Sequence, residues 1–249
     1  MSLRDKIYFA SDLHLGAPNF DESRIRECRF ISWLESVEED AKEIYILGDI
    51  FDFWFEYKYV VPKGFLRLFS KLIDLKNKGI EITILRGNHD MWMFDYFEQE
   101  LGIPVYDQVI EREFDGKKLL IGHGDGLGPG DTLFKIARKI FVNKACRKLF
   151  SWLHPDIGIG LANRWSRHSR AGHKEEEQKF LGKEKEFLVQ YCLEELEKKH
   201  YDYFLFGHRH LPIDFKLKEG SRYINTGDWI QYFSYAVLSE GDIELRYFK

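Results

Sequence analysis

The sequence predicts an α/β protein built on a parallel β-sheet, and three observations support this class. Short apolar runs of β type recur along the chain, helical patterns separate the first three, and polar residues follow each run directly. Continuous apolar runs are typical of strands buried on both faces, and strands alternating with helices form parallel sheets. Because parallel strands end at one edge of their sheet, we expect the polar residues to gather there.

The pattern of apolar residues along the chain predicts the first strands and helices. The apolar runs are residues 7–11, 44–47, 82–85, 119–121 and 203–206. The polar groups after them are Asp12-Leu13-His14, Gly48-Asp49-Ile50-Phe51-Asp52, Gly87-Asn88-His89-Asp90, Gly122-His123-Gly124-Asp125 and Gly207-His208-Arg209-His210. Helical spacing predicts helices at about 22–39 and 65–78. Their expected apolar stripes are Ile25, Phe30, Leu34 and Val37, and Phe65, Phe69, Leu72 and Ile73.

The carboxyl-terminal half has a different pattern. Asp115-Gly116 predicts a hairpin between 109–114 and 117–122. A long helix is expected at about 175–200. Short strands, expected in an antiparallel-rich second sheet, are predicted at about 213–218, 221–225, 232–238 and 243–248.

Residues 127–173 carry no strand pattern and are predicted to form a helical insertion, or cap, in a core of residues 1–126 and 174–249. From Asp131 to Arg170 the chain has nine Lys or Arg and two acidic residues, an excess of +7 that leaves −11 elsewhere. Apolar residues share one helix face there. A basic and apolar surface on an acidic protein suits an anionic amphiphile at a membrane surface, and packing of the apolar face on the core is the alternative.

The composition narrows the class of protein. The chain has 249 residues, 44% hydrophobic and 31% charged, as in soluble globular proteins. Its net charge of −4 argues against nucleic acid as a partner. Cys28, Cys146 and Cys192 lie far apart, as reduced thiols do. No apolar run approaches the ~18 residues of a membrane span, and no secretory signal is found. We therefore expect a cytoplasmic protein whose membrane contact is at most peripheral.

The residue types at the strand ends indicate metal chemistry. Each group alone has an ordinary interpretation as a turn or surface pair. Together they form a mixed nitrogen and oxygen ligand set that suits Mn²⁺, Fe²⁺, Zn²⁺ or Co²⁺. The seven candidates match two ions rather than one: Asp12, His14, Asp49, Asn88, His123, His208 and His210. Two such ions, ~3.5–4 Å apart, activate a water molecule and bind the attacking and leaving oxygens of a phosphoryl transfer.

The order and spacing of the five groups resemble the calcineurin-like metallophosphoesterase superfamily, over the chain outside the insertion. The resemblance implies a four-layer α/β/β/α sandwich. It implies one ion at Asp12, His14, Asp49 and His210, and another at Asp49, Asn88, His123 and His208, with Asp49 bridging them. His89 would donate to the phosphate or leaving oxygen, and Asp90 would orient His89. A non-catalytic scaffold of this fold would have lost ligands, whereas all seven are present.

Within the superfamily, the chain is similar to bacterial UDP-2,3-diacylglucosamine hydrolases of lipid A synthesis, through residues 12–15, 45–51 and 123–125 and the place of the insertion. This resemblance implies hydrolysis of the pyrophosphate bond of UDP-2,3-diacylglucosamine to UMP and 2,3-diacylglucosamine 1-phosphate, by a hydroxide bridging two divalent ions, with Mn²⁺ expected first. The cap would hold the acyl chains of this nucleotide-linked glycolipid. The expected substrate-binding residues are Arg164, Ser169, Arg170, Asp125 and Asp131.

The chain departs from the best-known hydrolases of this group at two positions. They carry Arg where this chain has His89, and Asn where it has His168. His89 is the usual residue of the superfamily. A dinuclear phosphoesterase that acts on another nucleotide, a phosphomonoester or a phosphodiester therefore remains the alternative.

Overall fold

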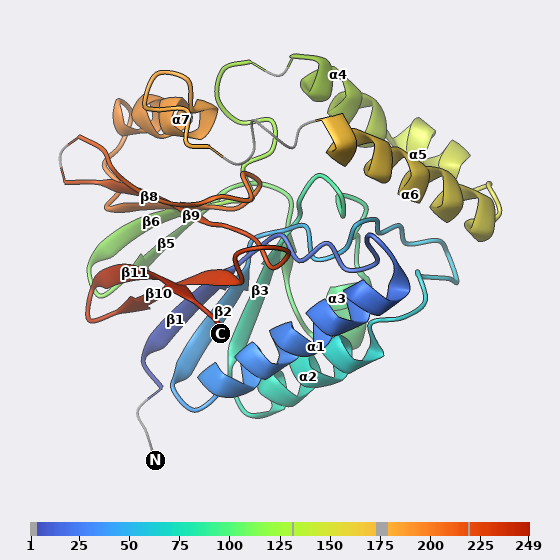
Figure 1. Ribbon diagram of the computed structural model, residues 1–249, viewed down its shortest axis with the longest axis horizontal. Coiled ribbons are helices and arrows are strands. Elements are labelled where there is room, and N and C mark those ends of the chain that lie inside the picture. Colours follow the sequence, from blue (N-terminus) through green and yellow to red (C-terminus); the bar gives the residue numbers. More distant parts are fainter. Residues whose placement is uncertain (1–3, 131, 173–178, 219) are drawn as a thin grey trace.

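Two β-sheets packed face to face form the centre of the protein (Figure 1). The computed structural model describes residues 4–130, 132–172, 179–218 and 220–249. The first sheet has the order β11-β10-β1-β2-β3-β4. Its strands are β1 (Lys6–Ala10), β2 (Ala41–Ile46), β3 (Glu81–Leu85), β4 (Val105–Tyr106), β10 (Ser234–Ser239) and β11 (Asp242–Tyr247). Strands β1 to β4 are parallel, so their carboxyl ends share one edge.

The second sheet has the order β5-β6-β7-β9-β8. Its strands are β5 (Ile110–Phe114), β6 (Lys117–Ile121), β7 (Tyr203–Phe206), β8 (Pro212–Lys216) and β9 (Arg222–Thr226). The predicted hairpin at Asp115-Gly116 is confirmed, since β5 and β6 pair in antiparallel register around it. Because β6, β7 and β9 are parallel, β6 and β7 end beside each other.

Helices cover the outer face of each sheet, which confirms the four layers (Figure 1). Helices α1 (Phe20–Val37) and α2 (Leu66–Asn77) pack on the first sheet, with the short α3 (Tyr96–Leu101) nearby, and α7 (Phe187–Leu196) packs on the second. The Asn19 side chain caps α1 by accepting a hydrogen bond from the Glu22 N–H. The expected stripes were wrong at Ile25 and Ile73, which are exposed.

Residues 132–172 contain three further helices, and the described part of this insertion has no strand, as its sequence pattern predicts. They are α4 (Thr132–Phe141), α5 (Lys144–Phe150) and α6 (Pro155–Gly172). They lie beyond the carboxyl ends of the parallel strands, over the edge where the polar groups were expected (Figure 1). The insertion therefore faces the candidate site.

Two expectations for the carboxyl-terminal half were wrong. Strands β10 and β11 belong to the first sheet, because β10 pairs antiparallel with β1 and so covers an edge that would otherwise be open. Residues 173–178 lie outside the described residues, and 179–186 are not helical. The helix begins only at Phe187 because the buried Glu186 carboxylate turns back to accept the Leu181 N–H and to pair with Arg209.

Candidate metal centre

The candidate ligands lie on tight loops at the ends of five strands. Five of them have a left-handed backbone, with φ of 57° at Asp12, 44° at His14, 52° at Asp49, 68° at His208 and 52° at His210. Such a backbone costs a non-glycine residue about 1–3 kcal/mol and is concentrated at functional sites. The loops also pack closely: a Cβ on Gly87 would lie 2.1 Å from Asp49 Oδ1, so only glycine fits there.

The first group of ligand atoms comes from Asp12, His14, Asp49 and His210, and these atoms all lie within 4.8 Å of one another. The Nε2 atoms of His14 and His210 are 3.2 Å apart. Asp12 Oδ1 lies 3.4 Å from His210 Nε2 and is buried, with no hydrogen-bond partner among the described residues. An unpartnered buried carboxylate oxygen is costly, and a cation at this point would satisfy it.

The second group contains Asp49, His123 and His208, also within 4.8 Å. Asn88 adjoins it, with Oδ1 3.2 Å from His123 Nε2. Asp49 Oδ2 lies 3.4 Å from His123 Nε2 and 3.5 Å from His14 Nε2. This single oxygen therefore sits between the two groups, as a bridging ligand would.

Contacts behind the ligands orient two of the imidazole rings. His123 Nδ1 is 2.6 Å from the Leu47 carbonyl, which can only accept, so Nδ1 carries a proton and Nε2 is the ring atom that faces the ligand group. His210 Nδ1 lies 3.4 Å from the Asp228 carboxylate. Such outer contacts are typical of metal-ligating histidines. The chemistry of the donors and the unpartnered Asp12 oxygen thus fit a pair of divalent ions.

The electrostatic environment keeps two candidate carboxylate ligands and one candidate histidine ligand in the deprotonated form that binds a metal ion. Burial opposes ionisation of Asp12, but His210 and other nearby histidines lower its pKa to about 2. Burial also opposes ionisation of Asp49, while His123 and its neighbours hold that pKa well below its ordinary value. Burial, and then the charge of His123, lower the pKa of His208 to about 3. Both carboxylates are therefore ionised and His208 is neutral at pH 7.

Protons occupy two other candidate ligands in the metal-free protein. Burial lowers the pKa of His14, but Asp12 and Asp52 outweigh it and raise that pKa to about 10. Burial is likewise outweighed at His123, where Asp49 raises the pKa well above its ordinary value. A metal ligand must be deprotonated, so metal binding at these histidines would release protons.

His89 is held at the edge of the first group by Asp52 and Ser166. Its Nδ1 lies 2.9 Å from the Asp52 carbonyl, so Nδ1 carries the proton and Nε2 remains for other contacts. Ser166, on α6, donates to Asp52 Oδ1 at 2.9 Å, and its Oγ lies 3.3 Å from His89 Nδ1. Burial lowers the pKa of His89. The insertion therefore contacts the candidate catalytic residue through a buried serine.

Asp90 does not orient His89, contrary to expectation. Its carboxylate is buried and accepts the backbone N–H groups of Gly87 and Ile50, each at 2.7 Å. Burial and then the nearby Asp49 raise the pKa of Asp90 to about 7. Asp90 braces two ligand-bearing loops against each other, and Asp52 takes the place beside His89.

Of the five expected substrate-binding residues, the structure describes the side chains of Asp125 and Arg164. Asp125 accepts from Arg138 Nε of α4 at 2.9 Å, so it ties the insertion to the core. Arg164 lies on α6 with an exposed side chain. Asp131 and the side chains of Ser169 and Arg170 lie outside the described residues. No sequence pattern indicates Ser166, whereas Asp52 belongs to the Gly-Asp-x-x-Asp group after β2 and Asp228 follows Gly227 at the end of β9.

The fold and the paired ligand groups define the class as a metal-dependent hydrolase of phosphate bonds. The family model for calcineurin-like phosphoesterases matches residues 5–212. A Porphyromonas gingivalis (strain W83) protein named UDP-2,3-diacylglucosamine hydrolase is 39% identical, covering 94% of this chain and 94% of its own. A protein of the same name from Shewanella sp. (strain W3-18-1) is 28% identical, covering 96% and 95%. The chain belongs to the calcineurin-like phosphoesterase family.

Proposed function

We propose that the chain hydrolyses the pyrophosphate bond of UDP-2,3-diacylglucosamine, giving UMP and 2,3-diacylglucosamine 1-phosphate. The observation that carries this proposal is the 39% identity, over 94% of both chains, to a hydrolase named for that substrate. The site supports the reaction type, since Asp49 lies between two ligand groups, each with two or more histidines.

The proposed chemistry divides between ions and side chains. Two divalent ions, Mn²⁺ in our proposal, would be held by the seven ligands and would supply an activated water and neutralise the phosphate charge. His89 would face the substrate through Nε2, because its Nδ1 is engaged by Asp52. A phosphate oxygen at that point favours the protonated ring, which can then donate to the leaving oxygen.

The insertion supports the lipid half of the proposal. In the described residues, its helices and the turn after α5 expose seven large apolar side chains: Ile136, Ile140, Leu149, Trp152, Leu153, Ile157 and Leu161. Lys144, Lys148 and Arg164 are exposed on the same helices. Basic and apolar side chains together favour anionic membrane surfaces. No helix in the described ranges is long and apolar enough to span a bilayer. We place the protein in the cytoplasm, bound peripherally to the cytoplasmic membrane, and propose that Arg164, Ser169 and Arg170 contact substrate.

The test compares three substrates with Mn²⁺-loaded protein: UDP-2,3-diacylglucosamine, UDP-N-acetylglucosamine and bis(p-nitrophenyl) phosphate. We expect strong preference for the acylated substrate, since acyl burial contributes ~0.8 kcal/mol per CH₂. In ¹⁸O-water the label should appear in UMP. Asp49→Asn is the matched inactive control. Comparable rates on all three substrates would leave the phosphoesterase chemistry intact and defeat the lipid assignment.

A further inference from the structure

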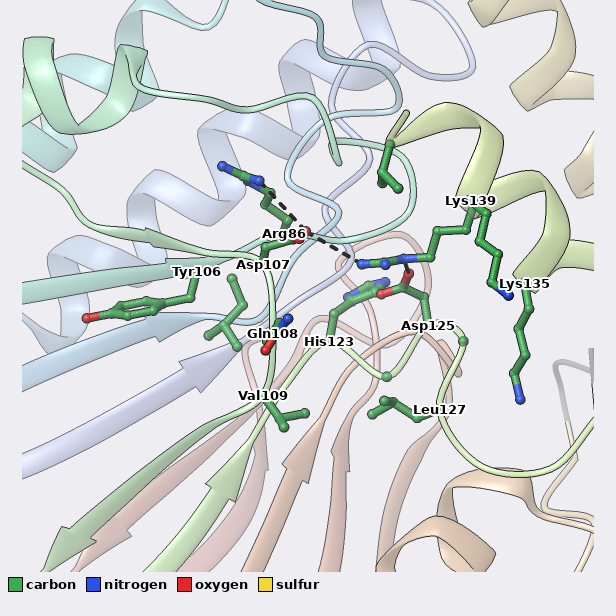
Figure 2. A pocket seen from close by; sticks show the side chains of 15 residues that line it. Arg86, Tyr106, Asp107, Gln108, Val109, His123, Asp125, Leu127, Lys135 and Lys139 are labelled. Carbon is green, nitrogen blue, oxygen red and sulfur yellow. Dashed lines mark hydrogen bonds and ion pairs between the residues drawn. The ribbon is translucent and has the colours of Figure 1, made fainter. Parts of the chain in front are cut away.

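A cavity of about 500 Å³ opens beside the candidate metal centre, between α4 and the segments that follow β3 and β4 (Figure 2). His123 lies in its wall, so the cavity reaches a candidate ligand directly. Helix α4 contributes Lys135, Arg138 and Lys139, and Val142 follows directly after the helix. These positions recur at helical spacing, so one face of α4 lines the cavity.

The lining has an excess of positive charge. Arg86 lies 3.7 Å from the Asp107 carboxylate, and Arg138 lies 3.5 Å from Asp107 and 2.9 Å from Asp125 (Figure 2). These two arginines are therefore balanced by two carboxylates. Lys135 donates to the Gly128 carbonyl. Lys139 is exposed and has no ion pair within the described part of the chain. The two lysines remain to attract an anion.

Another face of α4 meets an apolar region. Phe141 lies 5.8 Å, between ring centroids, from Trp92, which also lies 5.1 Å from Phe150 of α5. The Trp92 Nε1–H donates to the Phe141 carbonyl at 2.8 Å. These aromatic rings join the insertion to the core. Helix α4, which is part of the insertion, thus has the basic cavity on one face and the aromatic cluster on another.

We propose that the cavity binds the nucleoside 5′-monophosphate half of the substrate, an inference that rests on the proposed function. The substrate has one polar and one acylated half, and acyl chains favour the aromatic side of α4 over a cavity with four cations. The volume suits a small-molecule half-site. Gln108 offers both a donor and an acceptor for a base edge, and Val109 and Val142 provide apolar surface for the base and ribose.

The test uses hydrolysis of bis(p-nitrophenyl) phosphate by the Mn²⁺-loaded protein, with UMP and dodecyl phosphate as separate competitive inhibitors. Lys139→Glu reverses the unpaired charge, and Val142→Trp fills the cavity without a charge change. Lys42→Glu, at the exposed start of β2 and at the opposite end of that strand from the ligand loops, is the matched control for charge reversal. Both inhibitors carry a phosphate, so repulsion at the metal centre would weaken both together. The readout is therefore the ratio of the two inhibition constants.

We expect Lys139→Glu to raise the UMP constant relative to that of dodecyl phosphate by about three- to tenfold, as reversal of one exposed charge predicts. Val142→Trp should raise the same ratio, and Lys42→Glu should leave it unchanged. An unchanged ratio in both cavity variants, or weakening of dodecyl phosphate alone, would overturn the proposal. If the ratio rises but UDP-2,3-diacylglucosamine is not cleaved, the nucleotide site stands and the proposed substrate falls.

Discussion

Ser166 provides a direct test of how the insertion acts on the site. Its hydroxyl is buried and donates to the Asp52 carboxylate at 2.9 Å, across 114 residues of sequence. A hydrogen bond to a charged group contributes about 1.5–3 kcal/mol. Since Asp52 also holds His89 through its carbonyl, loss of the hydroxyl should loosen both α6 and His89.

We expect Ser166→Ala to lower kcat/KM on UDP-2,3-diacylglucosamine about 10- to 150-fold, the factor to which about 1.5–3 kcal/mol corresponds. Metal content, measured by elemental analysis, should not change, because Ser166 contacts none of the seven candidate ligands. Ser166→Thr keeps the hydroxyl and should recover most of the activity. Hydrogen exchange of α6 should increase in the alanine variant.

Ser151→Ala is the matched control for this experiment. Ser151 follows α5 in the same insertion, and its hydroxyl donates to the nearby Lys148 carbonyl. It should change kcat/KM by less than about twofold, as surface substitutions usually do. A Ser166→Ala enzyme with normal kcat/KM and unchanged exchange of α6 would refute the coupling between the insertion and His89.

Three further predictions concern the metals, His89 and the membrane. EDTA should abolish activity, and Mn²⁺ should restore it. Asp49→Asn should lose most activity because both ligand groups share the Asp49 carboxylate. Normal turnover and normal metal content in Asp49→Asn would contradict the bridging role. His89→Ala should lower kcat about 10²–10⁴-fold with metals retained, whereas activity kept in His89→Arg would make the residue a charge stabiliser rather than an acid. Trp152→Asp should reduce co-sedimentation with anionic phosphatidylglycerol vesicles. Leu66→Asp, at an equally exposed position on α2, should not. An equal loss of co-sedimentation in both variants would argue against membrane binding through the insertion.

The strands and the ligand loops could be predicted because their signals are local. Buried parallel strands such as β2 and β3 are continuous apolar runs, and a ligand such as Asp49 follows its strand directly. The first sheet brings together the ends of β1, β2 and β3, and the second sheet brings together those of β6 and β7. Packing of the two sheets then joins the seven candidate ligands, which are spread over about 200 positions of the sequence.

Other features depend on contacts between distant segments and have no local signal. The membership of β10 in the first sheet is decided by the open edge of β1. Ser166 is one polar residue in a polar helix, and only the packing of α6 brings it to Asp52. Asp90 has the sequence position of a catalytic partner, but its burial beneath two loops directs its carboxylate to backbone N–H groups.

The backbone of the site links metal binding to folding. Five candidate ligands are in the left-handed region, and each costs about 1–3 kcal/mol. Buried carboxylates add to this cost, and Asp12 Oδ1 has no hydrogen bond among the described residues. Ions that bind these groups in the native state, and only weakly in the unfolded chain, should offset part of the cost.

Metal should therefore raise the melting temperature. One ion at 100 times its Kd adds about 2.7 kcal/mol, which corresponds to a rise of about 5–11 °C for a chain of this size. Thermal unfolding after EDTA treatment, with and without Mn²⁺, measures the effect. Asp49→Asn should show a much smaller rise, because both ligand groups use that carboxylate. An equal rise in Asp49→Asn would show that the stabilising ion binds elsewhere, and no rise in the native chain would mean that the strained loops do not bind the metal.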